Sequence, residues 1–320
     1  MIDKLESVNI AVVIPSYRVK PFLKDVVATL PSYVNDIIVV DDKCPDESFK
    51  VVEGMEKVHI IRHEENQGVG GAMVSGYKKA LELEADIVVK VDGDGQMNPD
   101  LMLPLLKPLI ENRADYTKGN RFRDAEALKS MPSVRLFGNS VLSFLVKSAS
   151  GYWTIMDPTN GYTAIYRFAL QDLPLDSLDK RYFFESDMLI NLNIVGAVTK
   201  DVSMPAHYGD EESSLSIKKV IMDFPLKLLK GFLKRIKLEY FIYNFNAGSL
   251  YLSMGLPLFF FGVIYGILTA IEGEGSEITI ILPIVLGIQF LLQFLSIDMK
   301  AEPEKDLDIK IALLKKLNEH

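Results

Sequence analysis

The chain has 320 residues, more than one ordinary domain requires, and its mean hydropathy is positive at +0.16. Its 43 Asp and Glu residues outweigh 35 Lys and Arg, which gives a formal net charge of −8 and argues against a nucleic-acid partner. The single cysteine, Cys44, excludes an intrachain disulfide.

Apolar runs rich in β-branched residues alternate with helical patterns in the first hundred residues. The runs at 10–17, 36–42, 58–62 and 87–91 read as strands, whereas 19–30 and 68–83 read as helices. The order β-α-β-α-β-α-β predicts an α/β domain with a mostly parallel, Rossmann-like sheet covered on both faces. Such sheets bind ligands beyond the carboxyl ends of their strands, where Asp41, Asp42, Asp92 and Asp94 are then expected.

The strand at 87–91 ends on two aspartates, Asp92 and Asp94, separated by one glycine. Gly93 and Gly95 permit the sharp turn that would aim both carboxylates at one point. Oxygen ligands of this kind suit Mg²⁺ or Mn²⁺, with substrate phosphates completing the shell. The alternative is a solvated turn, since Asp and Gly are ordinary turn residues.

A glycine-rich run, Gly68-Val69-Gly70-Gly71, follows the strand at 58–62. It does not fit the G-x-G-x-x-G pattern of dinucleotide-binding folds, and it follows the third predicted strand instead of the first. We interpret it as a loop that lets a helix begin close to a nucleotide, or close to the sheet.

The chain resembles the family 2 glycosyltransferases with the GT-A fold, in particular the polyprenyl-phosphate and dolichol-phosphate hexosyltransferases. The resemblance covers about residues 8 to 212, and its motifs occur in the family's order. They are Ile14-Pro15-Ser16-Tyr17, Val39-Val40-Asp41-Asp42, Asn66-Gln67-Gly68-Val69-Gly70-Gly71-Ala72, Asp92-Gly93-Asp94-Gly95-Gln96, Gly119-Asn120-Arg121 and Asp157-Pro158-Thr159-Asn160-Gly161-Tyr162.

The resemblance implies a nucleotide-sugar site at the strand ends. The resemblance implies that Pro15, Tyr17 and Asp42 lie around the base and ribose, with Asp41 nearby and Gly68 in the glycine-rich loop. It also implies that Asp92, Asp94 and Gln96 bind a metal ion, which would neutralise the departing diphosphate. Cys44 stands where the family usually has Ser, a departure within this loop.

The resemblance also implies an acceptor side. Arg121 and Arg135 match basic positions of the family and would grip a phosphate, although either could instead pair with a surface acid. Asp157 is a candidate for contact with the donor sugar, and Asp187 and Glu185 form an acidic acceptor-side motif. Each of these acids could also be a capping residue.

The need for a general base depends on the acceptor. A hydroxyl would require one, whereas a phosphate monoester has a second pKa near 6 and is already largely ionised at neutral pH. His59, His63, His207 and His320 are scattered along the chain and indicate neither a zinc site nor a Ser-His-Asp triad.

Two uncharged apolar runs, at 250–271 and 278–297, are each long enough to cross a bilayer as a helix. The alternative is a pair of buried core helices. The intervening residues 272–277 carry acids without Lys or Arg, whereas basic residues precede the first run. The positive-inside rule then places both termini and the catalytic domain in the cytoplasm, in agreement with the absence of a signal peptide.

A basic amphipathic segment spans about 215–240, and we expect two helices broken near Pro225 that lie on anionic lipid. A solvated helix pair packed on the domain is the alternative. Residues 205–216 are expected to be a mobile loop over the site or a plain linker, and the tail after Lys300 a short cytosolic helix.

These observations predict four parts: a GT-A domain over 1–212, juxtamembrane helices over 213–248, two transmembrane helices over 249–298 and a tail over 299–320. The predicted reaction is an inverting, metal-dependent hexosyl transfer from a UDP- or GDP-sugar to a polyprenyl phosphate. A polysaccharide synthase is the enzymatic rival, but its Gln-x-x-Arg-Trp motif is missing, since the only tryptophan is Trp153. A non-catalytic, membrane-tethered binding protein is a further alternative. A homo-oligomer is possible, because Gly262, Gly266 and Ala270 could pack against another helix.

Overall fold

The computed structural model describes residues 5, 7–122, 133–205, 217–273 and 275–304. These residues divide into two compact units. One comprises the residues up to Gly231 together with those from Pro303 on, and the other comprises Phe232–Glu302. The structure describes only Pro205 of the loop expected at 205–216, and only residues 301–304 of the tail expected after Lys300. The side chain of Arg135 also lies outside the described residues.

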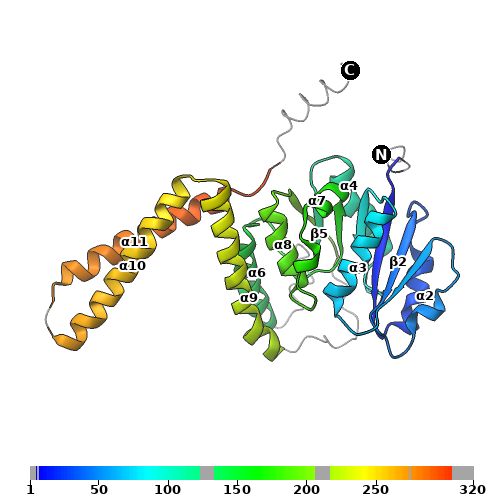
Figure 1. Ribbon diagram of the computed structural model, residues 1–320, viewed down its shortest axis with the longest axis horizontal. Coiled ribbons are helices and arrows are strands. Elements are labelled where there is room, and N and C mark those ends of the chain that lie inside the picture. The colour runs from blue at the N-terminus through cyan, green and yellow to red at the C-terminus, as the bar shows by residue number, and fades with distance from the viewer. Residues whose placement is uncertain (1–4, 6, 123–132, 206–216, 274, 305–320) are drawn as a thin grey trace, which may run out of the picture. The chain divides into compact units, whose positions relative to one another are not determined.

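The first unit is built on one mixed sheet of seven described strands, in the order β3-β2-β1-β4-β6-β5-β7 (Figure 1). The strands are β1 Ile10–Ser16, β2 Asp36–Asp41, β3 Val58–Arg62, β4 Ile87–Lys90, β5 Tyr116–Asn120, β6 Thr163–Tyr166 and β7 Thr199–Ser203. All neighbouring pairs are parallel except those that β6 makes with β4 and β5. The predicted parallel core of β1 to β4 is confirmed, and the sequence did not indicate β6 or β7.

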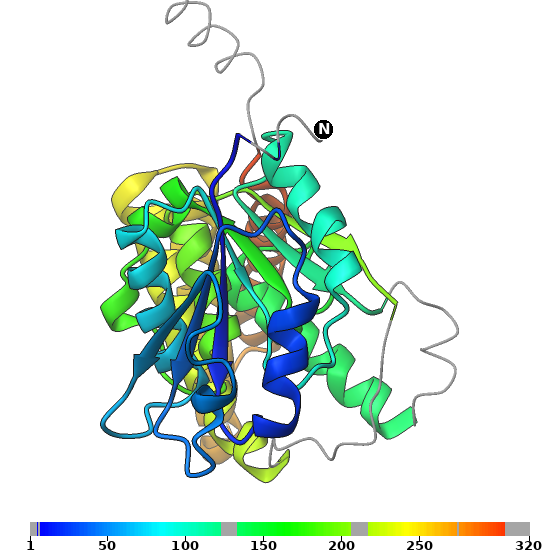
Figure 2. The same cartoon turned by 90° about the vertical axis from the view of Figure 1, so that its right-hand side faces the viewer.

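Helices cover both faces of this sheet because the strands alternate two apolar faces. Ile10, Val12 and Ile14 of β1 pack with residues of α2 and α4 on one face. Val13 points to the opposite face, where it meets Gly76 of α3, and Figure 2 shows α2 and α3 on opposite sides of the strands. The helices of this unit are α2 Lys20–Thr29, α3 Val69–Glu82, α4 Met102–Ile110, α6 Ser133–Ser150, α7 Arg167–Asp172 and α8 Phe184–Ile194, with short 3-10 turns η1 Ser48–Val51, η2 Pro99–Leu101 and η3 Leu175–Ser177.

The helix that follows the domain runs without interruption through its proline. Helix α9 spans Ile217–Lys237 with Pro225 inside it, and a π-helical segment, η4 Leu238–Tyr243, continues from its end. The expected break near Pro225 is therefore wrong. A proline removes one helical hydrogen bond, and here that loss does not end the helix.

The second unit contains two long apolar helices, α10 Ala247–Glu272 and α11 Glu277–Lys300. Their mean hydropathies of 2.0 and 2.3 and their lengths are sufficient to span a membrane. Only 11% of each apolar window is buried, so the alternative of two buried core helices is not supported. A buried ion pair joins Arg235 to Asp298 through two hydrogen bonds of 2.7 and 3.0 Å, and the Tyr240 hydroxyl donates to the same carboxylate.

Glycines allow α10 and α11 to pack closely. A Cβ at Gly262 would lie 2.6 Å from Ile284 Cγ1, and one at Gly266 would lie 3.1 Å from Ile280 Cγ2. These glycines therefore face α11 of the same chain, and their spacing gives no support to packing against a second chain.

The closest approach to backbone in this helix pair, at Gly287, can be tested. Gly287→Ala would place a methyl group 2.6 Å from the backbone nitrogen of Phe259 and 2.8 Å from its Cα. Because helical backbone cannot yield as a side chain can, the helices must separate, at a cost of about 1–3 kcal/mol. Gly266→Ala is the matched control, since its methyl meets only the end of a side chain. Thermal unfolding in detergent should show a lower melting temperature for Gly287→Ala alone, and equal melting temperatures would contradict this packing.

Candidate active site

The parallel register brings the carboxyl ends of β1 and β2 together, with Ser16 opposite Asp41. Tyr17 follows β1 and is exposed, and Pro15 is partly buried beside it. Asp41 is buried and accepts a hydrogen bond of 3.1 Å from the Cys44 N–H, and burial raises the pKa of its carboxyl. These residues lie at the edge where the sequence placed a nucleotide.

Asp42 is buried and binds the loop that precedes α3. Its carboxylate accepts hydrogen bonds from the backbone N–H groups of Gln67 at 2.8 Å and Gly68 at 2.7 Å, and contacts His63 Nδ1 at 2.8 Å. The carboxylate therefore positions the glycine-rich loop, a role that its sequence position did not suggest.

The glycine-rich run allows another chain segment to approach α3. Gly68 has a φ of 89°, and a Cβ there would lie 2.6 Å from the Lys180 carbonyl oxygen. The Gly71 N–H donates to that same oxygen at 3.0 Å. A side chain at Gly68 or Gly70 would push residues 179–181 away, so close packing explains these two glycines.

The metal candidates follow β4. Asp92 and Asp94 are partly exposed, Gln96 is exposed, and the Gln96 N–H donates to Asp94 Oδ1 at 3.0 Å. Gly95 has a φ of 78°, which turns the loop. Among the described residues no group of three or more His, Cys, Asp or Glu side chains gathers as a metal site. Two carboxylates and one amide supply hard oxygen donors only, which fits Mg²⁺ or Mn²⁺ with further ligands from a substrate diphosphate.

A buried lysine connects the metal candidates to the acidic motif of α8. Lys90 is 3% exposed, and its Nζ lies 2.9 Å from Asp92 Oδ1 and 3.3 Å from Glu185 Oε1. Burial alone would lower the pKa of Lys90, but the two carboxylates raise it above its ordinary value. The sequence feature that could have indicated this contact is a lysine, Lys90, within an apolar strand.

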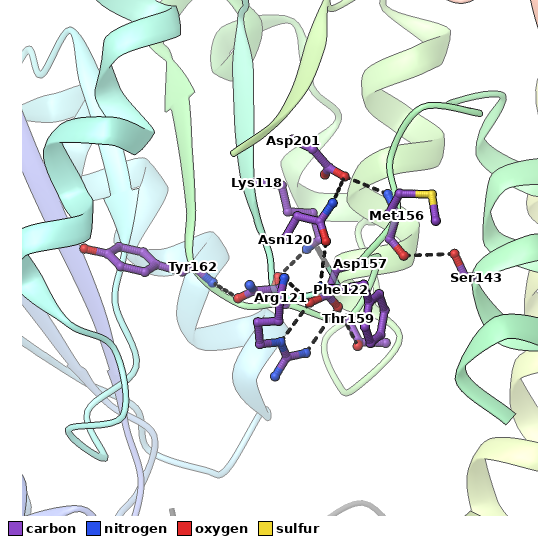
Figure 3. A network of polar contacts seen from close by, with 11 residues as sticks. Lys118, Asn120, Arg121, Phe122, Ser143, Met156, Asp157, Thr159, Tyr162 and Asp201 are labelled. Carbon is purple, nitrogen blue, oxygen red and sulfur yellow. Dashed lines mark hydrogen bonds and ion pairs between the residues drawn. The ribbon is translucent and has the colours of Figure 1, made fainter. Parts of the chain in front are cut away.

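The expected phosphate side lies at the end of β5 (Figure 3). Arg121 donates from Nε to Asp157 Oδ2 at 2.8 Å and from Nη2 to Oδ1 at 3.2 Å, and Thr159 also donates to Oδ1. Asp157 is fully buried. The structure thus brings Asp157 to Arg121, where it orients the guanidinium.

A second acid, the partly buried Asp201, lies beside this pair (Figure 3). Its Oδ2 accepts hydrogen bonds from Asn120 Nδ2 at 2.7 Å and from the Met156 N–H at 2.8 Å. Burial raises the pKa of Asp201 to about 6, although Lys118 opposes this rise. Burial also lowers the pKa of Lys118 to about 8. The sequence analysis did not identify Lys118 or Asp201. The only feature that could have indicated them is a charged residue within a strand.

The acidic motif at 185–187 is divided between two environments. Glu185 faces Lys90, whereas Asp187 accepts hydrogen bonds from the Asp179 N–H at 2.8 Å and from Asn191 Nδ2 at 3.0 Å. Asp187 therefore ties the loop before α8 to the helix, which agrees with the alternative of a loop-capping acid.

Gly161 links the metal side to the phosphate side. A Cβ on this glycine would collide with Lys90 Nζ and lie 2.8 Å from Asp92 Oδ2. Asp157, four residues earlier, holds Arg121. One short loop thus contacts both halves of the site.

Comparisons with known proteins agree with this geometry. A family model described as glycosyl transferase family 2 matches residues 11–173. The UDP-N-acetylglucosamine–dolichyl-phosphate N-acetylglucosaminyltransferase of Methanococcus voltae is 36% identical over 207 residues, which cover 59% of this chain and 80% of the relative. The undecaprenyl-phosphate mannosyltransferase of Micrococcus luteus is 26% identical over 211 residues, which cover 64% and 85%.

A solved structure shows the same fold. Glucosyl-3-phosphoglycerate synthase from Mycobacterium tuberculosis, in complex with Mn²⁺, UDP and glucosyl-3-phosphoglycerate, matches with a TM-score of 0.52 at 18% identity. The match covers 73% of this chain and 84% of that chain. The expected GT-A fold is confirmed, and the chain belongs to glycosyl transferase family 2 as a hexosyltransferase related to polyprenyl-phosphate glycosyltransferases.

Proposed function

We propose that this protein transfers a hexose or an N-acetylhexosamine from a nucleotide sugar to a polyprenyl phosphate, with inversion and with Mg²⁺ or Mn²⁺. The loop 157–161 carries the argument, because it contacts Asp92 at one end and holds Arg121 through Asp157 at the other. A donor diphosphate and an acceptor phosphate would then meet across one short loop.

Asp92, Asp94 and Gln96 would hold the metal, which would neutralise the diphosphate as it leaves. Lys90 orients the Asp92 carboxylate through their ion pair. Pro15, Tyr17, Asp41, Asp42 and Gly68 form the edge that we assign to the nucleotide, with Asp42 acting through the glycine-rich loop.

Arg121 is assigned to the acceptor phosphate, and Arg135 on α6 is assigned there from the sequence. A guanidinium carries five N–H donors, so one Arg can bind a carboxylate and a phosphate together. Asp157 fixes the plane of the Arg121 guanidinium through their hydrogen bonds. Beside this pair, Asn120 and the Met156 N–H donate hydrogen bonds to Asp201.

The proposed acceptor explains why no general base is required. Glu185 is paired with Lys90, and Asp187 is engaged at the start of α8. A phosphate monoester is largely ionised at neutral pH and can attack the anomeric carbon without losing a proton to either acid.

We further propose that α10 and α11 cross the membrane with the catalytic unit on the cytoplasmic side. Described basic residues of α9, including Lys227, Lys230 and Lys234, precede the first span, and Lys300 ends the second. Residues 272–277 between the spans carry acids without Lys or Arg. This asymmetry follows the positive-inside rule.

The reaction is tested with radiolabelled donors. We expect purified protein with a polyprenyl phosphate and Mn²⁺ or Mg²⁺ to label the lipid phase from one member of a panel of UDP- and GDP-sugars. UDP-N-acetylglucosamine is tried first, because the Methanococcus voltae relative is named for it. EDTA or Asp94→Ala should abolish the label. Transfer to a soluble glycan in place of the lipid would overturn the acceptor assignment.

A glycine variant tests the metal assignment separately. Gly161→Ala brings a methyl group against Lys90 and Asp92, and the lysine is too buried to move aside. Asp92 must therefore shift, and we expect the Mg²⁺ or Mn²⁺ concentration for half-maximal activity to rise about tenfold, equivalent to about 1.4 kcal/mol of metal binding. An unchanged metal dependence with lower activity would place Asp92 outside the metal shell.

The pKa of Asp201 generates a pH-dependent prediction. Because that pKa is raised to about 6, the folded state holds the proton more tightly than the unfolded chain, so stability is highest at acidic pH and is lost as the carboxyl ionises. Asp201→Asn keeps an oxygen for the Asn120 and Met156 donors without the charge. At pH 8 it should be more stable than the wild type by on the order of 2 kcal/mol and should unfold at a higher temperature. This advantage should shrink as the pH falls from about 6 towards the unfolded pKa of 3.8, and should be lost at about pH 3. Thermal melts at both pH values provide the test, and an equal difference at both would show that Asp201 does not titrate here.

A further inference from the structure

Lys118 of β5 is a fully buried cation at the phosphate side of the site. Its ammonium donates a hydrogen bond to the backbone carbonyl oxygen of Asn160, which is itself buried. Moving an ammonium out of water is costly unless nearby charges and hydrogen bonds compensate it. A buried strand position is ordinarily apolar, so a lysine there indicates a specific contact.

Acids on three separate elements keep this lysine charged at neutral pH. Burial lowers the pKa of the Lys118 ammonium to about 8, and Lys90 on β4 lowers it further. The acids that oppose this fall are Glu185, Asp157 and Asp201. Asp201 lies directly opposite Lys118 in the parallel register of β5 and β7 (Figure 3). A pKa of about 8 leaves most of the ammonium protonated at pH 7, so its hydrogen bond is charge-assisted.

The contact falls in the middle of the loop 157–161, between two ends that are already held. At one end the aspartate of this loop binds Arg121, and at the other Gly161 packs against Asp92. The carbonyl of Asn160 lies between these points. The lysine therefore joins the middle of the loop to β5.

The loop lies directly on this strand. A Cβ at Gly119 would lie 2.7 Å from Asn160 Nδ2, and the Gly119 N–H donates to the Tyr162 carbonyl oxygen at 2.9 Å. Asn160 Oδ1 in turn accepts a hydrogen bond of 2.9 Å from the Tyr162 N–H. Lys118 is the charged donor among these contacts, and its loss would remove a partner from a buried carbonyl group.

We propose that Lys118 is a positioning residue, which holds the loop 157–161 on β5 through the Asn160 carbonyl. The loop then keeps Arg121 and Asp92 at the separation that hexosyl transfer requires, so the inference rests on the proposed function. Lys118 acts through the loop, without contact to donor or acceptor. The residues assigned to the nucleotide lie at the ends of β1 and β2 and in the glycine-rich loop, so donor binding should not depend on this lysine.

Hydrogen–deuterium exchange tests the contact without any substrate. The full-length protein in detergent is compared with Lys118→Met, which keeps an unbranched side chain and removes the donor and the charge. We expect the backbone N–H groups of 157–162 to exchange about fivefold faster in this variant, and those of 66–72 at the wild-type rate. Lys200→Met is the control, because Lys200 is exposed on the neighbouring β7. Unchanged exchange at 157–162, or equally faster exchange at both segments, would overturn the proposal.

Initial rates at pH 7 separate positioning from general damage. For Lys118→Met we expect about a tenfold lower kcat, with a donor KM within about twofold of the wild-type value. Lys118→Arg keeps a cationic donor and should retain slow exchange at 157–162 and most of the rate. A wild-type kcat in Lys118→Met, or a raised donor KM in its place, would contradict the role. If the wild type labels no lipid, the proposed function fails, and the exchange measurement still decides whether Lys118 holds the loop.

Discussion

Buried positive charge beneath the strand ends is the constraint on which this active site depends. Lys90 on β4 and Lys118 on β5 both pair in register with Thr163 of the intervening β6, so they lie at one level of the sheet. Carboxylates gathered at one edge repel each other, and a buried acid is costly unless a cation or hydrogen bonds compensate it. Lys90 offsets Asp92 and Glu185, which compensates the acids at the start of the 92–96 loop.

The same principle recurs in the second unit. The Arg235–Asp298 ion pair is buried, and Tyr240 supplies a further donor to the carboxylate. Truncating one partner of such a pair costs more than the pair contributes, because the remaining charge stays buried and unpaired. The pair joins the end of α9 to the end of α11, and the glycine contacts keep α10 and α11 close. Both units thus rely on buried charges that are compensated within the chain.

Much of the fold could be predicted because its signals are local. The β-branched runs of β1, β2 and β4, the turn chemistry around Asp92 and Asp94, and the two long apolar helices can each be recognised within a short window. The continuous α9 was missed because a proline biases the chain toward a break without enforcing one. Strands β6 and β7 are no shorter than β4, but they lack a run of β-branched apolar residues such as Ile87-Val88-Val89, so no pattern identifies them.

The sequence by itself determined the family motifs, the order of strands and helices in the first hundred residues, and the length and apolarity of α10 and α11. Only the tertiary structure decided which groups are partners. Lys90 meets Glu185 across 95 positions, and Arg121 meets Asp157 across 36. The physical reason is that local patterns report periodicity and turn preference, whereas ion pairing and burial depend on which distant segments the sheet brings together.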